Sequence, residues 1–380
     1  MGRANTAAGA GRIDWTPLHS IADDRLWLRP LGLVYGHAAA EAVTAGLARP
    51  LARPGLAFSM VASIGLGSDR RPVSVTAPIA EFEGWLANAG RRFSSRARER
   101  LALLSAARRP WAGFPLDRPL VMGVLNVTPD SFSDGGRWLD AERAVAHGRA
   151  LVAAGADIVD VGGESTRPGA AELPAGEEIR RVEPVVRALA ETGAVVSIDT
   201  RHKAVMESAL AAGARIVNDV SALAHDPDSL TCVARRAAPV VLMHMLGEPG
   251  TMQRRPVYDS ALVEVLEYLD GRIAACAAAG IPRERIVVDP GIGFGKLVPH
   301  NLELIAGIGA FHALGCGVAL GVSRKSMIAR LSRGESPDGR LPGSLAAALC
   351  AAQQGVQILR VHDVVETRQA LTLWRAISDG

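Results

Sequence analysis

The sequence predicts an α/β protein in which a (β/α)8 TIM barrel follows a small N-terminal α/β extension. The first observation is a regular alternation, from residue 120 onward, of short apolar runs with segments of helical spacing. The second is that these runs are apolar throughout, which is typical of parallel strands covered by helices. The third is the length of this region, about 260 residues, which is the usual size of such a barrel.

Eight apolar runs are expected to be the barrel strands. They are residues 121–125, 157–161, 194–198, 215–217, 239–243, 285–288, 317–321 and 357–361. Segments of helical pattern lie between them, among them residues 141–154, 177–191, 203–212 and 260–279. A doubly wound parallel sheet is the alternative fold, but the GxGxxG turn that usually follows its first strand is absent.

Residues 1–115 are expected to form the extension, and residues 118–380 the barrel. Within the extension, residues 26–34 resemble a strand interrupted by Pro30, and residues 56–64 and 72–76 resemble further strands. Residues 37–48 form an Ala-rich helical pattern, and residues 79–109 have helical spacing with a break at Gly90. Residues 108–118, with two prolines, are expected to be a linker. The arginine-rich residues 91–100 favour a solvated helix face over contact with an acidic partner.

The composition fits a folded protein that stays in solution. Of the 380 residues, 48% are hydrophobic and 21% charged, which supports a large core. The net charge of +3 is too small to argue for nucleic acid. Because no apolar run reaches membrane-spanning length and the N-terminus lacks a secretory apolar stretch, we expect no membrane association and a cytoplasmic location. The four scattered cysteines are typical of core residues in a reducing compartment.

Polar or ionisable residues follow almost every expected barrel strand. They are Asn126, Glu164, Asp199, Asn218, Asp219, His244, Asp289, Ser323, Arg324, Lys325, Arg360 and His362. One such residue alone could be a helix N-cap. The carboxyl ends of barrel strands meet at one face, where active sites of this fold are built. Polar residues after eight successive strands therefore predict a single shared site.

The residue types at these strand ends indicate a kind of substrate. Carboxylates and amides, such as Asp199, Asn218 and Asp289, pair with a heterocycle that carries N–H donors and ring nitrogens. Cations, together with His362, hold a polyanion; they are Arg167, Lys325 and Arg360. The site is therefore expected to hold a flat polar ring at one end and a phosphate leaving group at the other.

Eight motifs in the barrel resemble the dihydropteroate synthase family, in the family's order. They are NVTPDSF (126–132), GESTRPG (163–169), SIDT (197–200), ND (218–219), LMHM (242–245), DPGIGFGK (289–296), SRKS (323–326) and RVH (360–362). The resemblance implies a transferase of folate biosynthesis. It would condense 6-hydroxymethyl-7,8-dihydropterin diphosphate with p-aminobenzoate, giving 7,8-dihydropteroate and diphosphate. It also suggests a homodimer, and it does not cover residues 1–115.

The resemblance further implies a role for individual residues. The pterin would be bound by Asn218, Met243, Asp289, Gly293, Phe294, Gly321 and Lys325. The diphosphate would be held by Arg360 and His362 with Mg²⁺, for which Asn126 is the protein ligand. The p-aminobenzoate pocket would include Phe132, Thr166, Arg167, Pro168 and Ser326. Asp199 would lie near the ring and stabilise its developing positive charge, so the catalytic set is Asp199, Lys325, Arg360 and His362.

Two other functions remain open from the sequence. A pterin-dependent methyltransferase domain shares the barrel, but it has no reason to keep the STRPG and SRKS segments and usually has a cobalamin-binding partner module. A non-catalytic paralogue would act through its extension, although the complete set of strand-end residues argues against it. A P-loop GxxxxGK[ST] and a zinc-binding HExxH are both absent.

Overall fold

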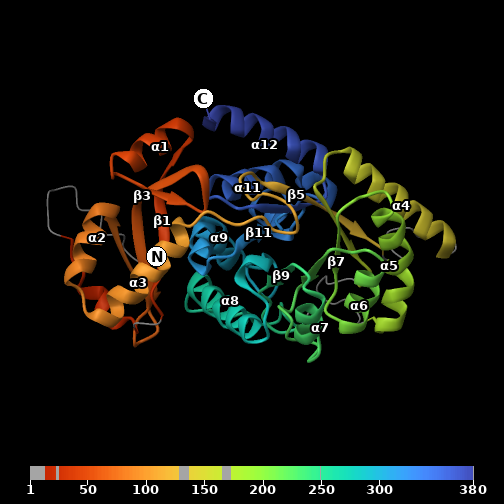
Figure 1. Cartoon of the computed structure of the whole chain (residues 1–380), viewed down its shortest axis with the longest axis horizontal. Helices are drawn as coiled ribbons and strands as arrows, with labels where there is room; N and C mark the ends of the chain where they lie inside the picture. The colour runs from red at the N-terminus through yellow and green to blue at the C-terminus, as the bar shows by residue number, and fades with distance from the viewer. Residues whose placement is uncertain (1–12, 23–24, 128–136, 165–172, 249, 380) are drawn as a thin grey trace.

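The larger part of the molecule is a closed barrel of eight parallel strands, in the order β10-β11-β12-β5-β6-β7-β8-β9 (Figure 1). The computed structural model describes residues 13–22, 25–127, 137–164, 173–248 and 250–379. The strands are β5 (Leu120–Asn126), β6 (Ile158–Gly162), β7 (Val196–Asp199), β8 (Ile216–Asp219), β9 (Val240–Met243), β10 (Ile286–Asp289), β11 (Gly317–Leu320) and β12 (Ile358–Val361). The predicted barrel is confirmed, and the doubly wound alternative is wrong.

Helices cover the outside of this barrel. They are α4 (Arg137–Ala153), α5 (Ala175–Ala190), α6 (Lys203–Ala211), α7 (Ser229–Arg236), α8 (Ala261–Ala278), α9 (Val298–Ala306), α10 (Ser326–Leu331), α11 (Leu341–Gln353) and α12 (Val364–Asp379). The four helices expected from residue spacing correspond to α4, α5, α6 and α8. Among the described residues, no helix has both the length and the apolar character needed to cross a membrane.

The segment between the extension and the barrel closes the amino end of the barrel. Trp111 and Leu116 are 1% and 4% exposed, and they pack on the inward-facing apolar residues of the strands. The indole N–H of Trp111 donates to the carbonyl of Arg285 at 2.9 Å, which satisfies its polar atom. Residues 108–118 join the extension to the barrel, as expected, but two large apolar side chains of this segment are also buried as a plug.

In its described residues, the extension contains an antiparallel four-stranded sheet with three α-helices. The sheet consists of β1 (Trp27–Tyr35), β2 (Arg49–Leu51), β3 (Arg53–Leu66) and β4 (Pro72–Pro78), and the helices are α1 (Gly36–Thr44), α2 (Ile79–Asn88) and α3 (Arg91–Ser105). The expected strands and helices are present, and Gly90 separates α2 from α3 as predicted. Pro30 does not interrupt β1, because β1 is an edge strand and proline is tolerated at a sheet edge. The short strand β2 was not predicted.

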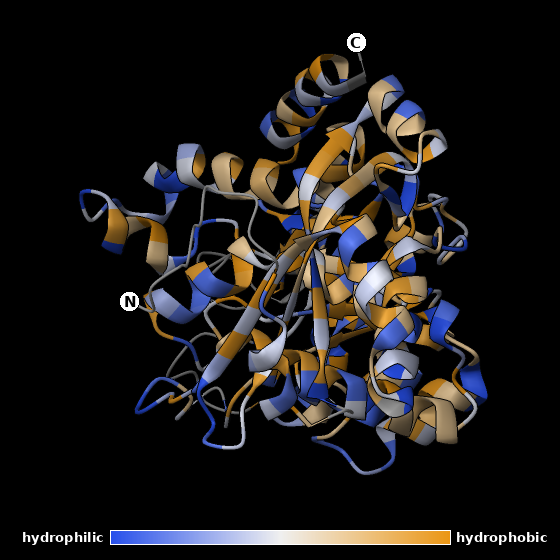
Figure 2. Ribbon diagram, turned by 90° about the vertical axis from the view of Figure 1, so that its left-hand side faces the viewer, coloured by the Kyte–Doolittle hydropathy of each residue, from blue (hydrophilic) through white to orange (hydrophobic). Residues whose placement is uncertain are grey.

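The extension packs on the barrel beside α8 and shares its hydrophobic core (Figure 1). Arg100 of α3 is 1% exposed, donates to Asp270 of α8 at 2.6 Å, and lies 3.7 Å above the Trp27 ring. Arg96 contacts the same carboxylate at 3.2 Å. The expectation that residues 91–100 form a solvated face is thus wrong for these two arginines, whose acidic partner is the barrel itself. Figure 2, which faces the extension, shows its strands largely apolar and its loops polar.

Candidate active site

The centre of the site is an ion-pair network built around Arg360 at the carboxyl end of β12. Its Nε donates to Asp160 of β6 at 2.6 Å, and its Nη2 donates to Asp199 of β7 at 2.7 Å. Strand β5 lies between β12 and β6, so the arginine reaches across the mouth of the barrel. Two predicted residues, Arg360 and Asp199, therefore contact each other directly, and the same guanidinium also binds Asp160, an acid that the sequence analysis did not select.

Burial and charge shift the ionisation of this network. Burial alone would lower the pKa of Arg360, but the carboxylates of Asp160 and Asp199 raise it above its usual value. Burial raises the pKa of Asp199, an effect that Arg360 opposes and Asp160 reinforces. The network therefore presents a permanently charged guanidinium beside a carboxylate that holds its proton more readily than a solvated aspartate.

Asn218 at the end of β8 is oriented by the same buried acid. Its Nδ2 donates to Asp160 at 2.9 Å, and the residue is 6% exposed. A carboxylate only accepts hydrogen bonds, so the amide NH₂ must face Asp160. The amide oxygen of Asn218 is consequently directed away from Asp160.

A second group of predicted residues gathers around Lys325, the residue before α10. Its Nζ lies 4.3 Å from the centre of the Phe294 ring, a cation–π contact. A Cβ added to Gly293 would lie 3.4 Å from Cδ of Lys325, so the loop backbone runs along the lysine stem. Burial and the charge of Arg360 lower the pKa of Lys325 to about 8. This lysine is therefore more easily deprotonated than a surface lysine.

Asp289 ends β10 beside Gly321 and Met243. Its Oδ1 accepts the backbone N–H of Gly291 at 2.7 Å, and burial raises its pKa. A Cβ added to Gly321 would lie 3.9 Å from Oδ2 of Asp289 and 3.8 Å from Cβ of Arg360. Met243 is 6% exposed on the neighbouring strand β9. One oxygen of Asp289 thus shapes its own loop, and the other lies toward the centre of the site.

His362 lies just beyond β12 and is held by Ser323. Its Nδ1 lies 3.0 Å from the Ser323 hydroxyl, and its backbone N–H donates to the same oxygen at 3.2 Å. Burial and the nearby Arg360 lower the pKa of His362 to about 4. The imidazole is therefore neutral near pH 7, and it acts as a hydrogen-bonding group and not as a cation.

Several strand-end residues serve the scaffold. Asp219 accepts bonds from the backbone N–H groups of Ser221 and Leu223, which shapes the loop after β8. Arg324 has φ +58 and donates to Asp363 through two nitrogens. The carboxyl ends of the strands therefore carry structural as well as chemical groups.

Two further predicted contributors sit at the edge of the described site. Asn126, at the end of β5, is half-buried beside Gly162 of β6. Ser326 is the first residue of α10 and is exposed. The other predicted residues, Phe132, Thr166, Arg167 and Pro168, lie outside the described residues.

A buried lysine was also missed by the sequence analysis. Lys296 is 2% exposed and contacts Nδ1 of His244 at 2.8 Å, and it donates to the carbonyls of His244 and Phe294. Burial lowers its pKa to about 7 and that of His244 to about 2. The lysine therefore ties the end of β9 to the loop that carries Phe294.

A signal for Asp160 exists in the sequence. It is a lone acid inside the apolar run of β6, and a buried carboxylate requires a partner. Its partners come from strands far away in the chain, so only the folded barrel identifies them.

Among the residues that the structure describes, two places offer ligands for a metal ion. Asn126 supplies one amide oxygen, which suits Mg²⁺ because this ion takes few protein ligands and prefers phosphate oxygens and water. Glu164, Glu178 and His202 place one ligand atom each within 4.8 Å of one another. Glu164 already accepts two bonds from Arg201, at 3.1 Å each, so one of the three groups of this second cluster is committed to an ion pair, and a second group, His202, offers nitrogen where Mg²⁺ prefers oxygen. Asn126 therefore fits the expected Mg²⁺ better.

Comparison with known proteins identifies the family. A family model described as pterin binding enzyme matches residues 122–362. A dihydropteroate synthase of Escherichia coli (strain K12) is 48% identical over 262 residues, which cover 69% of this chain and 92% of the relative. The chain belongs to the dihydropteroate synthase family. The match of the family model begins at residue 122, so the extension lies outside it.

Solved structures of dihydropteroate synthases share the barrel. That of Xanthomonas albilineans with 4-aminobenzoic acid is 49% identical, with a TM-score of 0.67, and the match covers 71% of this chain and 97% of that one. A complex of the enzyme from the same organism with 7,8-dihydropteroate is 46% identical, with a TM-score of 0.64 and coverage of 70% and 96%. All of the strand ends described above lie within residues 122–362, the part that matches the pterin binding enzyme family model.

Proposed function

We propose that the chain condenses 6-hydroxymethyl-7,8-dihydropterin diphosphate with p-aminobenzoate, releasing diphosphate and 7,8-dihydropteroate. The observation that carries this proposal is the Arg360 network, which sets a fixed cation and the Asp199 carboxylate beside the amide of Asn218. This arrangement suits a substrate with an anionic leaving group next to a polar heterocycle. Family membership supports the synthase over a pterin-dependent methyltransferase or a non-catalytic paralogue.

The pterin ring is proposed to lie between Asn218, Asp289 and Lys325. The Oδ2 of Asp289 is suited to accept N–H bonds from the amino-pyrimidine edge, and the amide of Asn218 to pair with ring atoms. Lys325, with its pKa lowered to about 8, donates to ring oxygen or nitrogen acceptors. Gly293, Phe294, Gly321 and Met243 form the walls of this proposed pocket.

The diphosphate is proposed to lie against Arg360 and His362. The raised pKa of Arg360 keeps its charge throughout the pH range of the reaction. The neutral His362 offers a hydrogen bond without adding charge. Asn126 would hold Mg²⁺, which, when bound, neutralises the charge that collects on the leaving diphosphate.

The reaction is proposed to be a dissociative substitution at the pterin methylene. The C–O bond breaks, diphosphate leaves with the electron pair, and the dihydropterin carries the positive charge. The Asp199 carboxylate stabilises that charge electrostatically. The amine of p-aminobenzoate, which is neutral at pH 7, then forms the C–N bond and loses one proton to water. No strong general base is required.

The second substrate is proposed to bind near Ser326. The exposed hydroxyl and backbone N–H of this residue are suited to the carboxylate of p-aminobenzoate. The family resemblance assigns Phe132, Thr166, Arg167 and Pro168, which lie outside the described residues, to the same substrate.

A diphosphate-release assay tests the function. Release that requires both substrates supports the synthase, whereas methyl transfer or no turnover contradicts it. Asp199→Ala is expected to lower kcat by about 10²–10³-fold, the usual effect of removing an electrostatic stabiliser, with little change in pterin affinity. Asp69→Ala, at an exposed acid of the extension, is the control and should change neither value. Weaker binding with an unchanged kcat would overturn the role of Asp199.

We further propose that the protein is a cytoplasmic homodimer. We also propose that the chain has two domains, residues 1–115 and residues 118–380. The free cysteines among the described residues support a reducing compartment. Helix α12 exposes three large apolar side chains, Val365, Leu373 and Ile377, at 59%, 63% and 71%. Such a row of apolar side chains on one helix favours contact with a second copy.

A further inference from the structure

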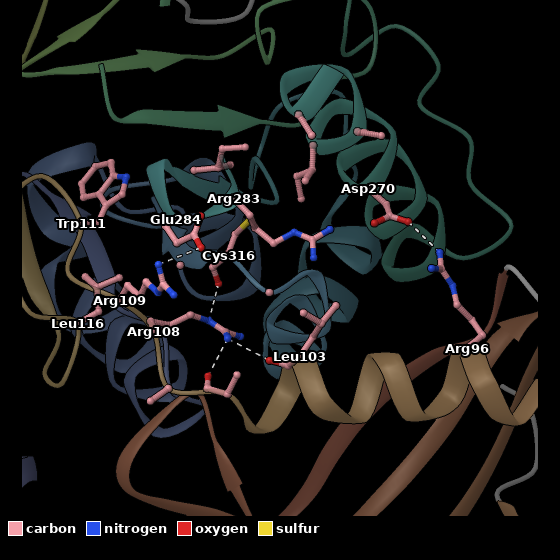
Figure 3. Close-up of a pocket in the computed structure, with 18 residues that line it drawn as sticks. Arg96, Leu103, Arg108, Arg109, Trp111, Leu116, Asp270, Arg283, Glu284 and Cys316 are labelled. Carbon is pink, nitrogen blue, oxygen red and sulfur yellow. Dashed lines mark hydrogen bonds and ion pairs between the residues drawn. The ribbon is translucent and has the colours of Figure 1, made fainter. Parts of the chain in front are cut away.

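A cleft lies between the extension and the barrel, at the end opposite the candidate active site (Figure 3). Its volume is about 660 Å³, and it is lined on one side by the end of α3 and the residues that follow it. The other side consists of α8, the 3-10 helix η4 (Arg283–Arg285) and the first residues of β10 and β11. The cleft therefore exists because the extension packs against the amino end of the barrel.

The walls of the cleft carry more positive than negative charge. The cations are Arg96, Arg108, Arg109 and Arg283, and the acids are Asp270 and Glu284. Both acids are already engaged: Asp270 pairs with Arg96 and Arg100, and Glu284 lies 3.6 Å from Arg109. The cleft thus has two cations in excess of its acids, Arg108 and Arg283.

Arg108 is a half-buried cation without a carboxylate partner among the described residues. Its nitrogens donate to the carbonyls of Leu103, Ala106, His312 and Cys316, at 2.7 to 3.0 Å. Burial, with a smaller contribution from the nearby charge of Arg283, lowers its pKa to about 10. The carbonyls hold the guanidinium in place but do not neutralise it.

Arg283 supplies the second uncompensated charge. Its stem covers Gly315, whose added Cβ would lie 3.0 Å from Cδ of Arg283. In the part of the chain that the structure describes, its guanidinium has no ion pair or hydrogen bond. Figure 3 shows it extending between Cys316 and Asp270. Two neighbouring guanidinium groups without a counter-charge repel each other, and a bound anion would relieve that repulsion.

The remaining wall of the cleft is apolar. It is formed by Leu103, Trp111, Leu116, Ile273, Ala274, Ala277 and Ile286. Pockets of this size that bind small molecules combine a mainly apolar wall with a few fixed polar groups. We propose that this cleft binds a small organic anion: a carboxylate, phosphate or sulfonate on a flat apolar body, with Arg283 contacting the anionic group.

The test uses the full chain and two fluorescent probes with the same ring system. 8-Anilino-1-naphthalenesulfonate carries the anionic group, and N-phenyl-1-naphthylamine lacks it. We expect the sulfonate to bind at least tenfold more tightly than the neutral probe. Arg283→Glu should weaken sulfonate binding by about tenfold or more, because a charge-assisted hydrogen bond is replaced by repulsion. Arg71→Glu, which makes the same charge change at an exposed arginine outside the cleft, should leave binding unchanged.

A second variant tests the apolar wall without disturbing the fold. Ala277 is exposed on α8, so Ala277→Phe fills the cleft without entering the core. Binding of the sulfonate should fall while circular dichroism and Tm stay at the parent values. Equal affinity for the two probes would overturn the proposal. Unchanged binding in Arg283→Glu would also overturn it, because this result means that the probe binds elsewhere, such as at the active site. The diphosphate-release assay tests the proposed function independently of this cleft.

Discussion

Replacement of Asp160 offers the sharpest test of how the active site is held together. Asp160 is fully buried, and its Oδ2 accepts both the Arg360 Nε bond at 2.6 Å and the Asn218 Nδ2 bond at 2.9 Å. Its Oδ1 is buried and has no hydrogen bond to any described residue. In Asp160→Asn the amide oxygen can occupy the Oδ2 position and keep both bonds, so this variant removes the charge and leaves the geometry.

The size of the effect follows from these contacts. Hydrogen bonds to charged groups contribute about 1.5–3 kcal/mol and neutral ones about 0.5–1.5 kcal/mol. In Asp160→Asn only the Asn218 bond becomes neutral, because the Arg360 guanidinium keeps its charge, so the loss should be roughly 1–2 kcal/mol. Asp160→Ala also removes one of the two carboxylates that bind Arg360. Breaking a buried pair costs about 3–5 kcal/mol, and we expect the lower end because Arg360 keeps Asp199. That arginine also remains 25% exposed, which limits the loss.

Two measurements check this reasoning. Urea unfolding should give the highest free energy of unfolding for the parent, a lower value for Asp160→Asn and the lowest value for Asp160→Ala. Diphosphate-release kinetics should show a raised KM for the dihydropterin diphosphate, because Arg360 and Asn218 lose their shared anchor. Ser197→Ala is the control: its hydroxyl is buried on the neighbouring strand, opposite Asp160, and has no hydrogen bond to a described residue. A loss below 1 kcal/mol in Asp160→Ala with an unchanged KM would refute the anchoring role.

Two other predictions concern stability and assembly. Burial raises the pKa of Glu178 from 4.5 to about 8, so its contribution to stability is complete below pH 4.5 and is lost as pH rises through 8. The Tm of the parent should therefore fall between pH 5 and 9, and this fall should be smaller in Glu178→Gln. Parallel curves of Tm against pH for the variant and the parent would contradict this. Leu373→Glu with Ile377→Glu should convert a dimer to a monomer in light scattering, while Val257→Glu, at a residue 76% exposed in a loop, should not. A monomeric parent chain would exclude the dimer.

Much of the candidate active site could be predicted because its residues are local features of the sequence. Asp199, Asn218, Asp289 and Arg360 each follow or end an apolar run, and the barrel topology places all such ends on one face. The partners of these residues could not be predicted in the same way. Asp160 looks like one more residue of a strand until β12 brings Arg360 across the barrel mouth. A hydrogen bond between residues 200 positions apart leaves no local signal.

The sequence by itself determined the barrel, the family and the positions of the strand-end groups, because hydrophobic periodicity and local motifs encode them directly. Only the tertiary structure decided that Trp111 and Leu116 plug the barrel, and that Arg96 and Arg100 face an acid of α8. The same packing creates the cleft in which Arg283 has no counter-charge among the described residues. Burial and ion pairing depend on which surfaces meet, and the barrel residues that contact Arg100 and Trp111 lie about 170 positions away in the chain.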